Sequence, residues 1–129
     1  MKNAAIYTRS ASPNEQAIKM QLEVCRDYAQ AHGYKVVAEF TDNGYSGMNF
    51  DRLEFISMNN DCGKWKTLIV YSIDRISRNS SEFFKYRKIL LNKGIEIISI
   101  VNSPTKETFE LLDVLRKRYA IIQKEAKTK

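Results

Sequence analysis

Residues 68–79 read LIVYSIDRISRN, an apolar run that is followed at once by one carboxylate and two guanidiniums. The apolar run is typical of a buried strand, and Asp74, Arg75 and Arg78 stand at its end. Arg75 and Arg78 are three positions apart, so a single helical turn would put both side chains on one face. Two guanidinium forks on one face suit a phosphate that gains charge during a reaction. A solvated, charged loop would contain the same residues, so the rest of the chain has to decide.

Composition limits the class of protein. The 129 residues are 43% hydrophobic, which suits one domain with its own core. No apolar run approaches the ~20 residues that span a bilayer, and the first residues do not resemble a signal peptide. Cys25 and Cys62 lack metal-ligand spacing, which indicates reduced thiols and a cytoplasmic protein. The single histidine, His32, stands before Gly33 at a predicted helix end, so we expect neither a histidine base nor a zinc site.

Positive charge is concentrated at the C-terminal end. Of the formal net charge of +6, residues 116–129 carry +5, from six Lys and Arg residues against Glu125. A basic end on a nearly neutral body indicates contact with an anionic polymer such as nucleic acid, although a solvated helix face would show the same pattern. The candidate DNA-binding side chains are Arg116, Lys117, Arg118 and Lys124.

Strands and helices are predicted to alternate along the chain. The predicted strands are residues 4–8, 35–41, 67–71 and 95–101. The predicted helices run from residue 13 to about 33, from 52 to 61, from 80 to 92, and from 105 onward. The alternation implies βαβ crossovers. We therefore expect an α/β fold of three layers, with a mostly parallel central sheet of four to five strands, helices on both faces and a long C-terminal helix.

Capping signals and helical spacing predict how these helices begin and which side chains they bury. Ser12, followed by Pro13 and Glu15, is the predicted N-cap of the first helix, and Asn79 with Glu82 begins the third. The residues expected to point inward are Ile18, Leu22, Cys25 and Ala29, then Leu53, Ile56 and Met58, then Phe83, Tyr86, Ile89 and Leu90, and finally Phe109, Leu112, Leu115, Tyr119 and Ile122.

Three segments should meet at one edge of the sheet, because parallel sheets bind ligands outside the carboxyl ends of their strands. These segments are residues 9–12, 42–52 and 72–78. No glycine-rich phosphate loop or nucleotide fingerprint is present, and the nearby carboxylates are not clustered, so no cofactor is predicted. What remains is a hydroxyl, an acid and several arginines. Arginines can stabilise an anionic phosphoryl transition state, with each donor worth roughly 3–4 kcal/mol. A serine that attacks a phosphodiester there would form a covalent phosphoserine.

The chain resembles the catalytic domain of the serine site-specific recombinases, the family of resolvases, invertases and the larger transposon and phage integrases. The resemblance covers nearly the whole length. It is carried by IYTR at residues 6–9, FTDNGYSG at 40–47 and DRISRN at 74–79, together with Gln21, the pair 51–52 and the pair 63–64.

The resemblance implies a reaction with double-stranded DNA, and neither a membrane nor a small-molecule substrate. In the family a serine attacks the DNA backbone, forms a 5′-phosphoserine link and frees a 3′-hydroxyl. Strands then exchange within a synaptic tetramer and are rejoined without metal or nucleotide energy. By position, the scissile phosphate would be bound by Arg9, Arg75 and Arg78, with Asp74 supporting them or acting as an acid. Supporting positions are Arg52, Gln21 and Tyr7, and the matched residues Ser46, Asp42 and Asp51 are at least as well explained by a loop-building role.

The sequence leaves the nucleophile open. The family's Arg-x-Ser pattern puts its serine where this chain has Ala11, whereas counting back from Gln21 puts it at Ser12, as though one residue were inserted after Arg9. Ser12 is also the predicted N-cap, and a capping hydroxyl cannot at once be a free nucleophile. The candidates are therefore Ser12, Ser10, or a lapsed active site in a non-enzymatic DNA-associated or regulatory module.

The resemblance assigns residues 1–129 to one catalytic domain. In the family a linker and a DNA-binding domain normally follow, so that C-terminal domain is absent from this chain, which is either a catalytic fragment or a naturally short protein. The last helix would help to form a homodimer, or else belongs to the domain's own core. A receiver- or flavodoxin-like signalling domain shares the order of elements, but a receiver needs acidic residues where Arg9 stands.

Overall fold

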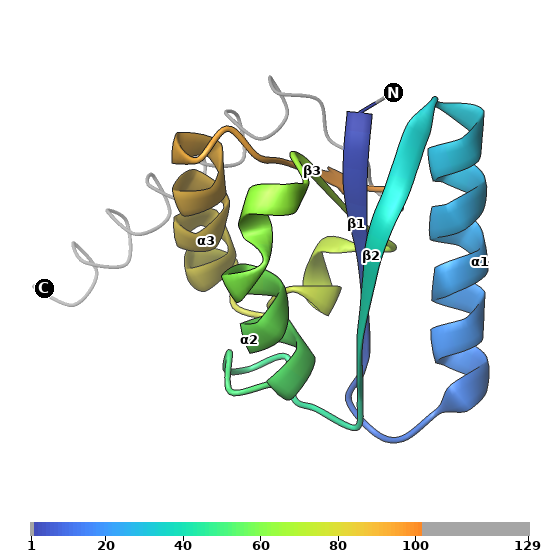
Figure 1. The fold of residues 1–129 in the computed structure, drawn as a ribbon. Coiled ribbons are helices and arrows are strands. Elements are labelled where there is room, and N and C mark those ends of the chain that lie inside the picture. Colours follow the sequence, from blue (N-terminus) through green and yellow to red (C-terminus); the bar gives the residue numbers. More distant parts are fainter. Residues whose placement is uncertain (1, 102–129) are drawn as a thin grey trace, which may run out of the picture.

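The computed structural model describes residues 2–101 and shows one sheet with helices on both faces (Figure 1). The α/β class and the parallel sheet are therefore confirmed. The predicted final helix, with its apolar stripe and basic residues, lies outside the described residues.

The elements are β1 (Lys2–Ser10), α1 (Glu15–Ala31), β2 (Tyr34–Asn43), α2 (Leu53–Asn60), β3 (Thr67–Val70), α3 (Ser80–Asn92) and β4 (Glu96–Ser99), with short 3₁₀ helices η1 (Cys62–Lys64) and η2 (Ile73–Arg75).

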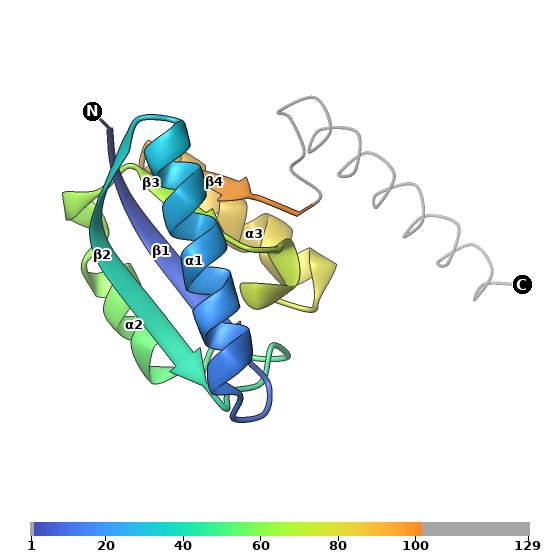
Figure 2. The same cartoon turned by 90° about the vertical axis from the view of Figure 1, so that its right-hand side faces the viewer.

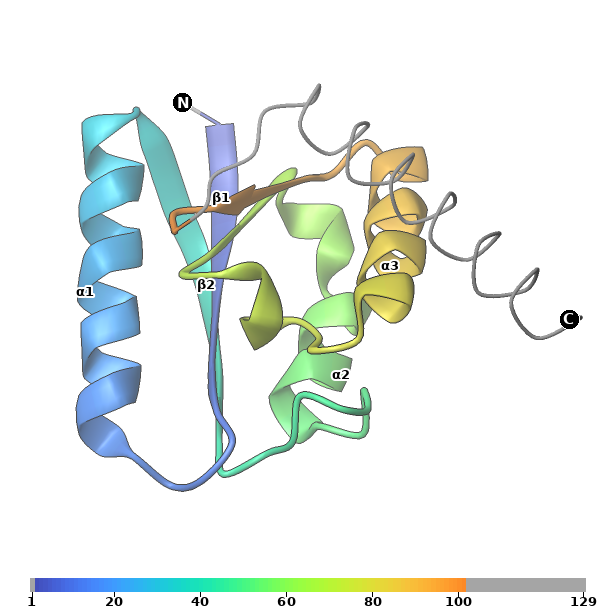
Figure 3. The same cartoon turned by 180° about the vertical axis from the view of Figure 1, so that it is seen from behind.

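The four strands are parallel and lie in the order β2-β1-β3-β4. The neighbours β1 and β3 are followed by helices on opposite faces, α1 on one side and α3 on the other (Figures 2 and 3). This change of side marks the switch point of the sheet, and parallel sheets of this kind bind ligands at the carboxyl edge of such a point. The switch point lies where the predicted functional segments should meet.

Both faces of the central strands are buried, so the strand sequences are almost continuously apolar. Successive residues alternate between two core clusters, one under each layer of helices. The α1 layer covers Ala4, Ile6 and Ile69 with Cys25 and Ala29, and the α2–α3 layer covers Ala5, Tyr7, Leu68 and Val70 with Phe55, Met58, Phe83, Tyr86 and Leu90. Among the described residues, no helix has the length and apolar character that a membrane span requires.

Strands β1 and β2 extend two residues beyond their predicted ends. Arg9 pairs with Asp42, and Ser10 pairs with Asn43, so these residues belong to the sheet ladder rather than to loops. The strand β4 is shorter than predicted and covers only Glu96–Ser99. Arg9 is consequently held by the rigid sheet, whereas the segments that surround it are irregular.

The N-cap of α1 is Asn14, so the prediction of Ser12 is wrong. The Asn14 Oδ1 accepts a hydrogen bond from the Ala17 N–H at 3.0 Å. The Asn14 N–H donates in turn to the Asn43 Oδ1 at 2.8 Å. Because this second bond anchors Asn14 to the end of β2, the helix begins after it and Pro13 stays outside. The Ser12 hydroxyl therefore has no capping role.

Three apolar side chains that were predicted to point inward are exposed: Leu53 by 71%, Ile56 by 47% and Ile89 by 52%. The third helix has the predicted cap, since the Asn79 side chain accepts from the Glu82 N–H, and it buries its other predicted residues.

The rotation of α2 is set from outside the helix by Asp42. The carboxylate of Asp42 accepts from the N–H groups of Glu54 and Phe55, both at 2.9 Å. Phe55 and Met58 consequently face the core. Helical spacing predicted the burial of Met58 but not that of Phe55.

Removing the Asp42 carboxylate is expected to destabilise the domain. Asp42 is 1% exposed and accepts from the Tyr7 hydroxyl as well as from the two N–H groups of α2. Since Asp42→Ala leaves three donors without an acceptor, the free energy of unfolding should fall by roughly 3 kcal/mol. Chemical denaturation measures this change. The matched control is Asp51→Ala, at an exposed position, which should alter stability by no more than about 0.5 kcal/mol. Equal losses for the two variants would contradict the capping role.

Candidate active site

Arg9 joins the three segments that were predicted to meet. It is fully buried near the end of β1. Its guanidinium donates to the carbonyl oxygens of Tyr45 at 2.9 Å, Asp74 at 2.6 Å and Arg75 at 3.0 Å. Its backbone N–H donates to the Gln21 Oε1 at 3.2 Å, and its carbonyl oxygen accepts from the Gln21 Nε2 at 3.0 Å. One arginine and one glutamine thus tie α1, the loop after β2 and the segment after β3 to the end of β1.

Arg52 holds the segment after β3 from the other side. It is also fully buried, immediately before α2. Its guanidinium donates to the carbonyl oxygens of Arg75, at 3.2 Å, and of Ile76, and to the Tyr7 hydroxyl at 3.1 Å. The cation lies over the Phe55 ring, with 4.8 Å from Cζ to the ring centroid. The η2 turn is therefore positioned by two buried arginines.

Burial perturbs the ionisable groups at this edge of the sheet. It raises the pKa of Tyr7 well above the ordinary value, so the hydroxyl stays protonated and donates to Asp42 at 2.7 Å. Burial, and then the charge of Arg52, lower the pKa of Arg9. Within residues 2–101 neither Arg9 nor Arg52 forms an ion pair with a carboxylate. The one buried carboxylate among the described residues, Asp42, reaches Arg52 only through the Tyr7 hydroxyl, so the interior of the site keeps a surplus of positive charge.

The η2 turn covers Arg75 but ends before Arg78, so the two side chains do not share a turn as the spacing suggested. Arg75 is partly buried, and its Nη1 donates to the Arg9 carbonyl oxygen at 3.2 Å. Asp74 is half-exposed, lies 3.8 Å from the Arg75 Nε and accepts from the Ser72 hydroxyl. Arg78 is exposed. The two arginines therefore differ in access to solvent, although they are close in sequence.

Gly47 lies between Arg9 and Arg78. A Cβ atom at this position would stand 2.6 Å from the Arg9 Nη2 and 3.0 Å from the Arg78 Cγ. The Gly47 carbonyl oxygen also accepts from the Arg78 N–H at 3.0 Å. Only a residue without a side chain allows both arginines to lie this close to the backbone. Gly47 therefore lets the side chains of Arg9 and Arg78 pack against the same residue.

The two candidate serines have different surroundings. Ser10 is 8% exposed, and its hydroxyl donates to the Ser12 carbonyl oxygen at 2.6 Å. Ser12 is exposed, and it follows Arg9 by three positions in the segment that leaves β1. Ser12 is therefore the candidate whose hydroxyl is accessible.

The predicted loop-building role of the remaining matched residues agrees with their contacts. Asp42 caps α2, and the Ser46 Oγ accepts from the Met48 N–H at 3.0 Å. The Asp51 N–H donates to the Asn49 Oδ1 at 3.0 Å. Sequence reasoning missed two members of the site, Ser72 and Gly47. Gly47 belongs to the matched block at residues 40–47, but its contact with Arg9 has no signal in the sequence.

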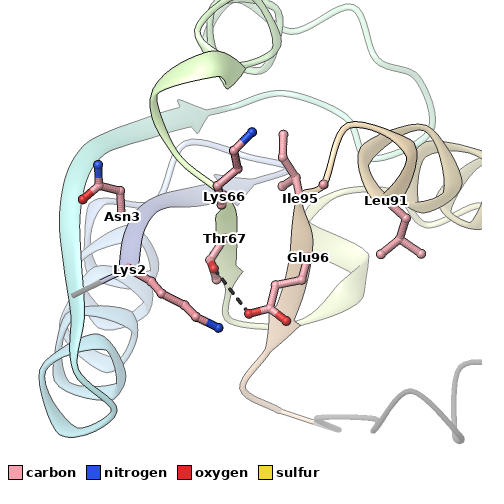
Figure 4. A pocket seen from close by; sticks show the side chains of 8 residues that line it. Lys2, Asn3, Lys66, Thr67, Leu91, Ile95 and Glu96 are labelled. Atoms are coloured by element: carbon pink, nitrogen blue, oxygen red, sulfur yellow. Dashed lines mark hydrogen bonds between the residues drawn. The ribbon is translucent and has the colours of Figure 1, made fainter.

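A groove of about 750 Å³ lies beside the site, and it contains Asp74 and Arg78 from the predicted set. Its other lining residues are Tyr71, Ser72, Ile73, Ser77, Ser80 and Val101. A second pocket, of about 470 Å³, lies at the opposite edge of the sheet, where β1, β3 and β4 begin (Figure 4). None of the predicted site residues lines that pocket. Within residues 2–101, no three His, Cys, Asp or Glu side chains are grouped as a metal site requires.

Comparison with known proteins identifies the family and the fold of the chain. Residues 4–126 match the family described as Resolvase, N terminal domain. The fold is similar to the N-terminal catalytic domain of TP901-1 integrase, with 27% identity, a TM-score of 0.86, and coverage of 97% of this chain and 99% of that chain. It is also similar to the C-terminal catalytic domain of ISC1926 TnpA, an IS607-like serine recombinase, with 26% identity, a TM-score of 0.71, and coverage of 88% and 78%.

A third solved structure, a resolvase family site-specific recombinase from Streptococcus pneumoniae, shares the fold at 21% identity, with a TM-score of 0.78 and coverage of 98% and 90%. No curated protein sequence matches the chain.

Adding a methyl group at Gly47 is expected to disturb the site, because Arg9 is fixed by three hydrogen bonds and cannot move aside. Gly47→Ala should lower the free energy of unfolding by roughly 2 kcal/mol, as overpacking does. The control is Gly63→Ala, since a Cβ there meets nothing within 4 Å. That variant should be neutral or up to about 1 kcal/mol more stable. Denaturant titrations compare the two, and a Gly47→Ala protein as stable as Gly63→Ala would contradict the close contact.

Proposed function

Because this chain belongs to the resolvase family and has the fold of a serine recombinase catalytic domain, we propose that Ser12 attacks a DNA phosphodiester. The attack forms a 5′-phosphoserine link and breaks the bond to the 3′-oxygen. The serine proton ends on that oxygen, which becomes a free 3′-hydroxyl. One phosphate ester replaces another, so the strands can be exchanged and rejoined without an energy source.

The observation that carries this proposal is the group of arginines at the carboxyl edge of β1 and β3. Two of them are buried without a carboxylate partner among residues 2–101, and a third, Arg75, is 3.8 Å from the half-exposed Asp74. A buried cation that lacks an acid is costly unless an anion is bound nearby. A phosphate that gains charge in the transition state would supply this anion, and preorganised donors then stabilise it.

We assign different roles to the arginines according to their contacts. Arg75 and the exposed Arg78 bind the scissile phosphate. Arg9 adds its positive charge from the interior, where its carbonyl partners hold it in place. Arg52 assists by holding the η2 segment, at the Arg75 and Ile76 carbonyl oxygens.

Three further residues support the reaction. Gln21 orders the backbone of Arg9 through two hydrogen bonds. Tyr7 links Arg52 to Asp42 and stays in the protein interior. We assign the relay of the serine proton to the leaving oxygen to Asp74, whose side chain is 47% exposed.

Ser12 is preferred as nucleophile to Ser10 on two grounds. The argument against Ser12 was its predicted capping role, and Asn14 takes that role instead. Ser10 is buried, and its hydroxyl already donates to a carbonyl oxygen. The exposed Ser12 has the access that a DNA backbone requires.

The proposal includes the partners that the sequence indicated. The substrate is double-stranded DNA, and the protein acts in the cytoplasm as a homodimer that becomes a tetramer in the synaptic complex. Residues 1–129 act as the catalytic domain, which the family joins to a separate DNA-binding domain. The basic side chains proposed to contact the DNA backbone are Arg116, Lys117, Arg118 and Lys124.

The intact recombinase is expected to become covalently attached to DNA that carries its crossover site. The adduct should survive denaturing detergent. After nuclease treatment, trypsin should release residues 10–19 as one modified peptide, because cleavage follows Arg9 and Lys19. Fragment masses then distinguish Ser12 from Ser10.

Ser12→Ala should abolish the adduct. Full cleavage by this variant would contradict the assignment. DNA binding by the unmodified protein without any adduct would instead support the alternative, a resolvase-like DNA-associated or regulatory module that has lost its reaction.

Arg78 and Arg52 should respond differently to substitution. Arg78→Ala should slow cleavage roughly 100- to 1000-fold and change stability by no more than about 0.5 kcal/mol, because the side chain is exposed. Arg52→Ala should cost roughly 3 kcal/mol or more of stability, since it leaves buried acceptors unpaired. The control for lost charge is Lys88→Ala, on the exposed side of α3, which should cleave normally. Single-turnover cleavage and thermal melting measure the two properties, and equal cleavage by the Arg78 and Lys88 variants would contradict phosphate binding by Arg78.

A further inference from the structure

Residues 10–14 form an arch that is held at both ends by the segment that ends β2. At one end, the Ser10 carbonyl oxygen accepts from the N–H groups of Gly44, at 2.8 Å, and Tyr45, at 3.1 Å. At the other end, the Asn14 N–H donates to the Asn43 Oδ1 at 2.8 Å. Both ends are therefore fixed by the same neighbour, and the arch between them carries the proposed nucleophile.

One side-chain hydrogen bond spans the arch from within. The Ser10 Oγ donates to the Ser12 carbonyl oxygen at 2.6 Å, and Ser10 is 8% exposed. The bond closes a turn over Ala11. It engages the backbone of Ser12 and leaves the Ser12 hydroxyl unaffected.

The length of the arch makes this bond important. Arg9 and Ser12 are separated by two residues, so the proposed nucleophile has one more residue of freedom than an Arg-x-Ser arrangement allows. Each added residue increases the number of backbone conformations that must be excluded before the hydroxyl meets the phosphate. Holding a reacting group in position can contribute a large share of the lowering of a barrier, and a displacement of about 1 Å can cost about 100-fold in rate.

We propose that Ser10 is a positioning residue for the nucleophile, whose hydroxyl fixes the backbone of Ser12 across the additional residue and takes no part in the chemistry. The inference rests on the proposed function, since it presumes that Ser12 attacks. It gives the second serine of the arch a role that is distinct from that of a substitute nucleophile.

The test compares Ser10→Ala with a variant that loses the same kind of bond elsewhere. Ser99 is also buried, and its Oγ donates to the Val101 carbonyl oxygen at 2.7 Å, two positions further on. In the intact recombinase with its crossover-site DNA in excess, Ser10→Ala should form the covalent adduct about tenfold more slowly or worse, with an unchanged Kd for DNA. Ser99→Ala should react within about twofold of the wild-type rate.

A conservative variant provides a rescue. Ser10→Thr keeps the hydroxyl and should recover most of the rate that Ser10→Ala loses. If the additional methyl of threonine does not fit at this buried position, the comparison of the Ser10 and Ser99 alanine variants decides the question by itself. Thermal melting accompanies each measurement, so that a loss of rate at equal stability is attributed to positioning.

The outcomes separate this inference from the function on which it rests. If Ser10→Ala reacts as fast as Ser99→Ala while Ser12→Ala is inactive, the positioning role is wrong and the proposed reaction stands. If Ser12→Ala still forms an adduct, the proposed nucleophile is wrong. If the adduct maps to Ser10 by fragment masses, both statements are overturned.

Discussion

The structure of the site depends on the burial of one cation, the Arg9 guanidinium. Its hydrogen bonds reach carbonyl oxygens in two separate segments, at Tyr45 and at Asp74 and Arg75. Irregular segments seldom pair their own carbonyl groups, and unpaired buried carbonyls are costly. A planar guanidinium can satisfy them together because its donors are spread over three nitrogens, whereas a lysine carries its donors on one nitrogen. The loops at this edge are therefore ordered by a side chain rather than by regular secondary structure.

The same arrangement connects the stability of the domain to its proposed chemistry. Arg52 reaches the η2 segment and also contacts the Tyr7 hydroxyl, which donates to Asp42. Asp42 caps α2. A chain of hydrogen bonds thus runs from a helix start to the arginine-rich segment after β3. Because these polar groups are buried, each needs its partner, and the position of α2 and the position of η2 depend on each other.

Sequence patterns were most reliable where one local rule acts alone. The apolar runs predicted all four strands, and Asn79 with Glu82 predicted the start of α3 correctly. They failed where a distant residue competes. Asn14 replaced Ser12 as N-cap because Asn43 anchors it, and α2 is rotated by the Asp42 carboxylate, so that Leu53 and Ile56 face outward.

The sequence by itself determined the order of strands and helices along the chain, the parallel sheet, and the identity of the residues at the carboxyl edge of that sheet. These conclusions rest on hydrophobic periodicity and βαβ connectivity, which are properties of the chain. Only the tertiary structure decided which of those residues are accessible. Arg9 and Arg52 are buried and Arg78 is exposed, and the hydroxyl of Ser10 is engaged whereas Ser12 is exposed. Accessibility depends on contacts between segments that are far apart in sequence, such as Gly47 against Arg9, and no local pattern records them.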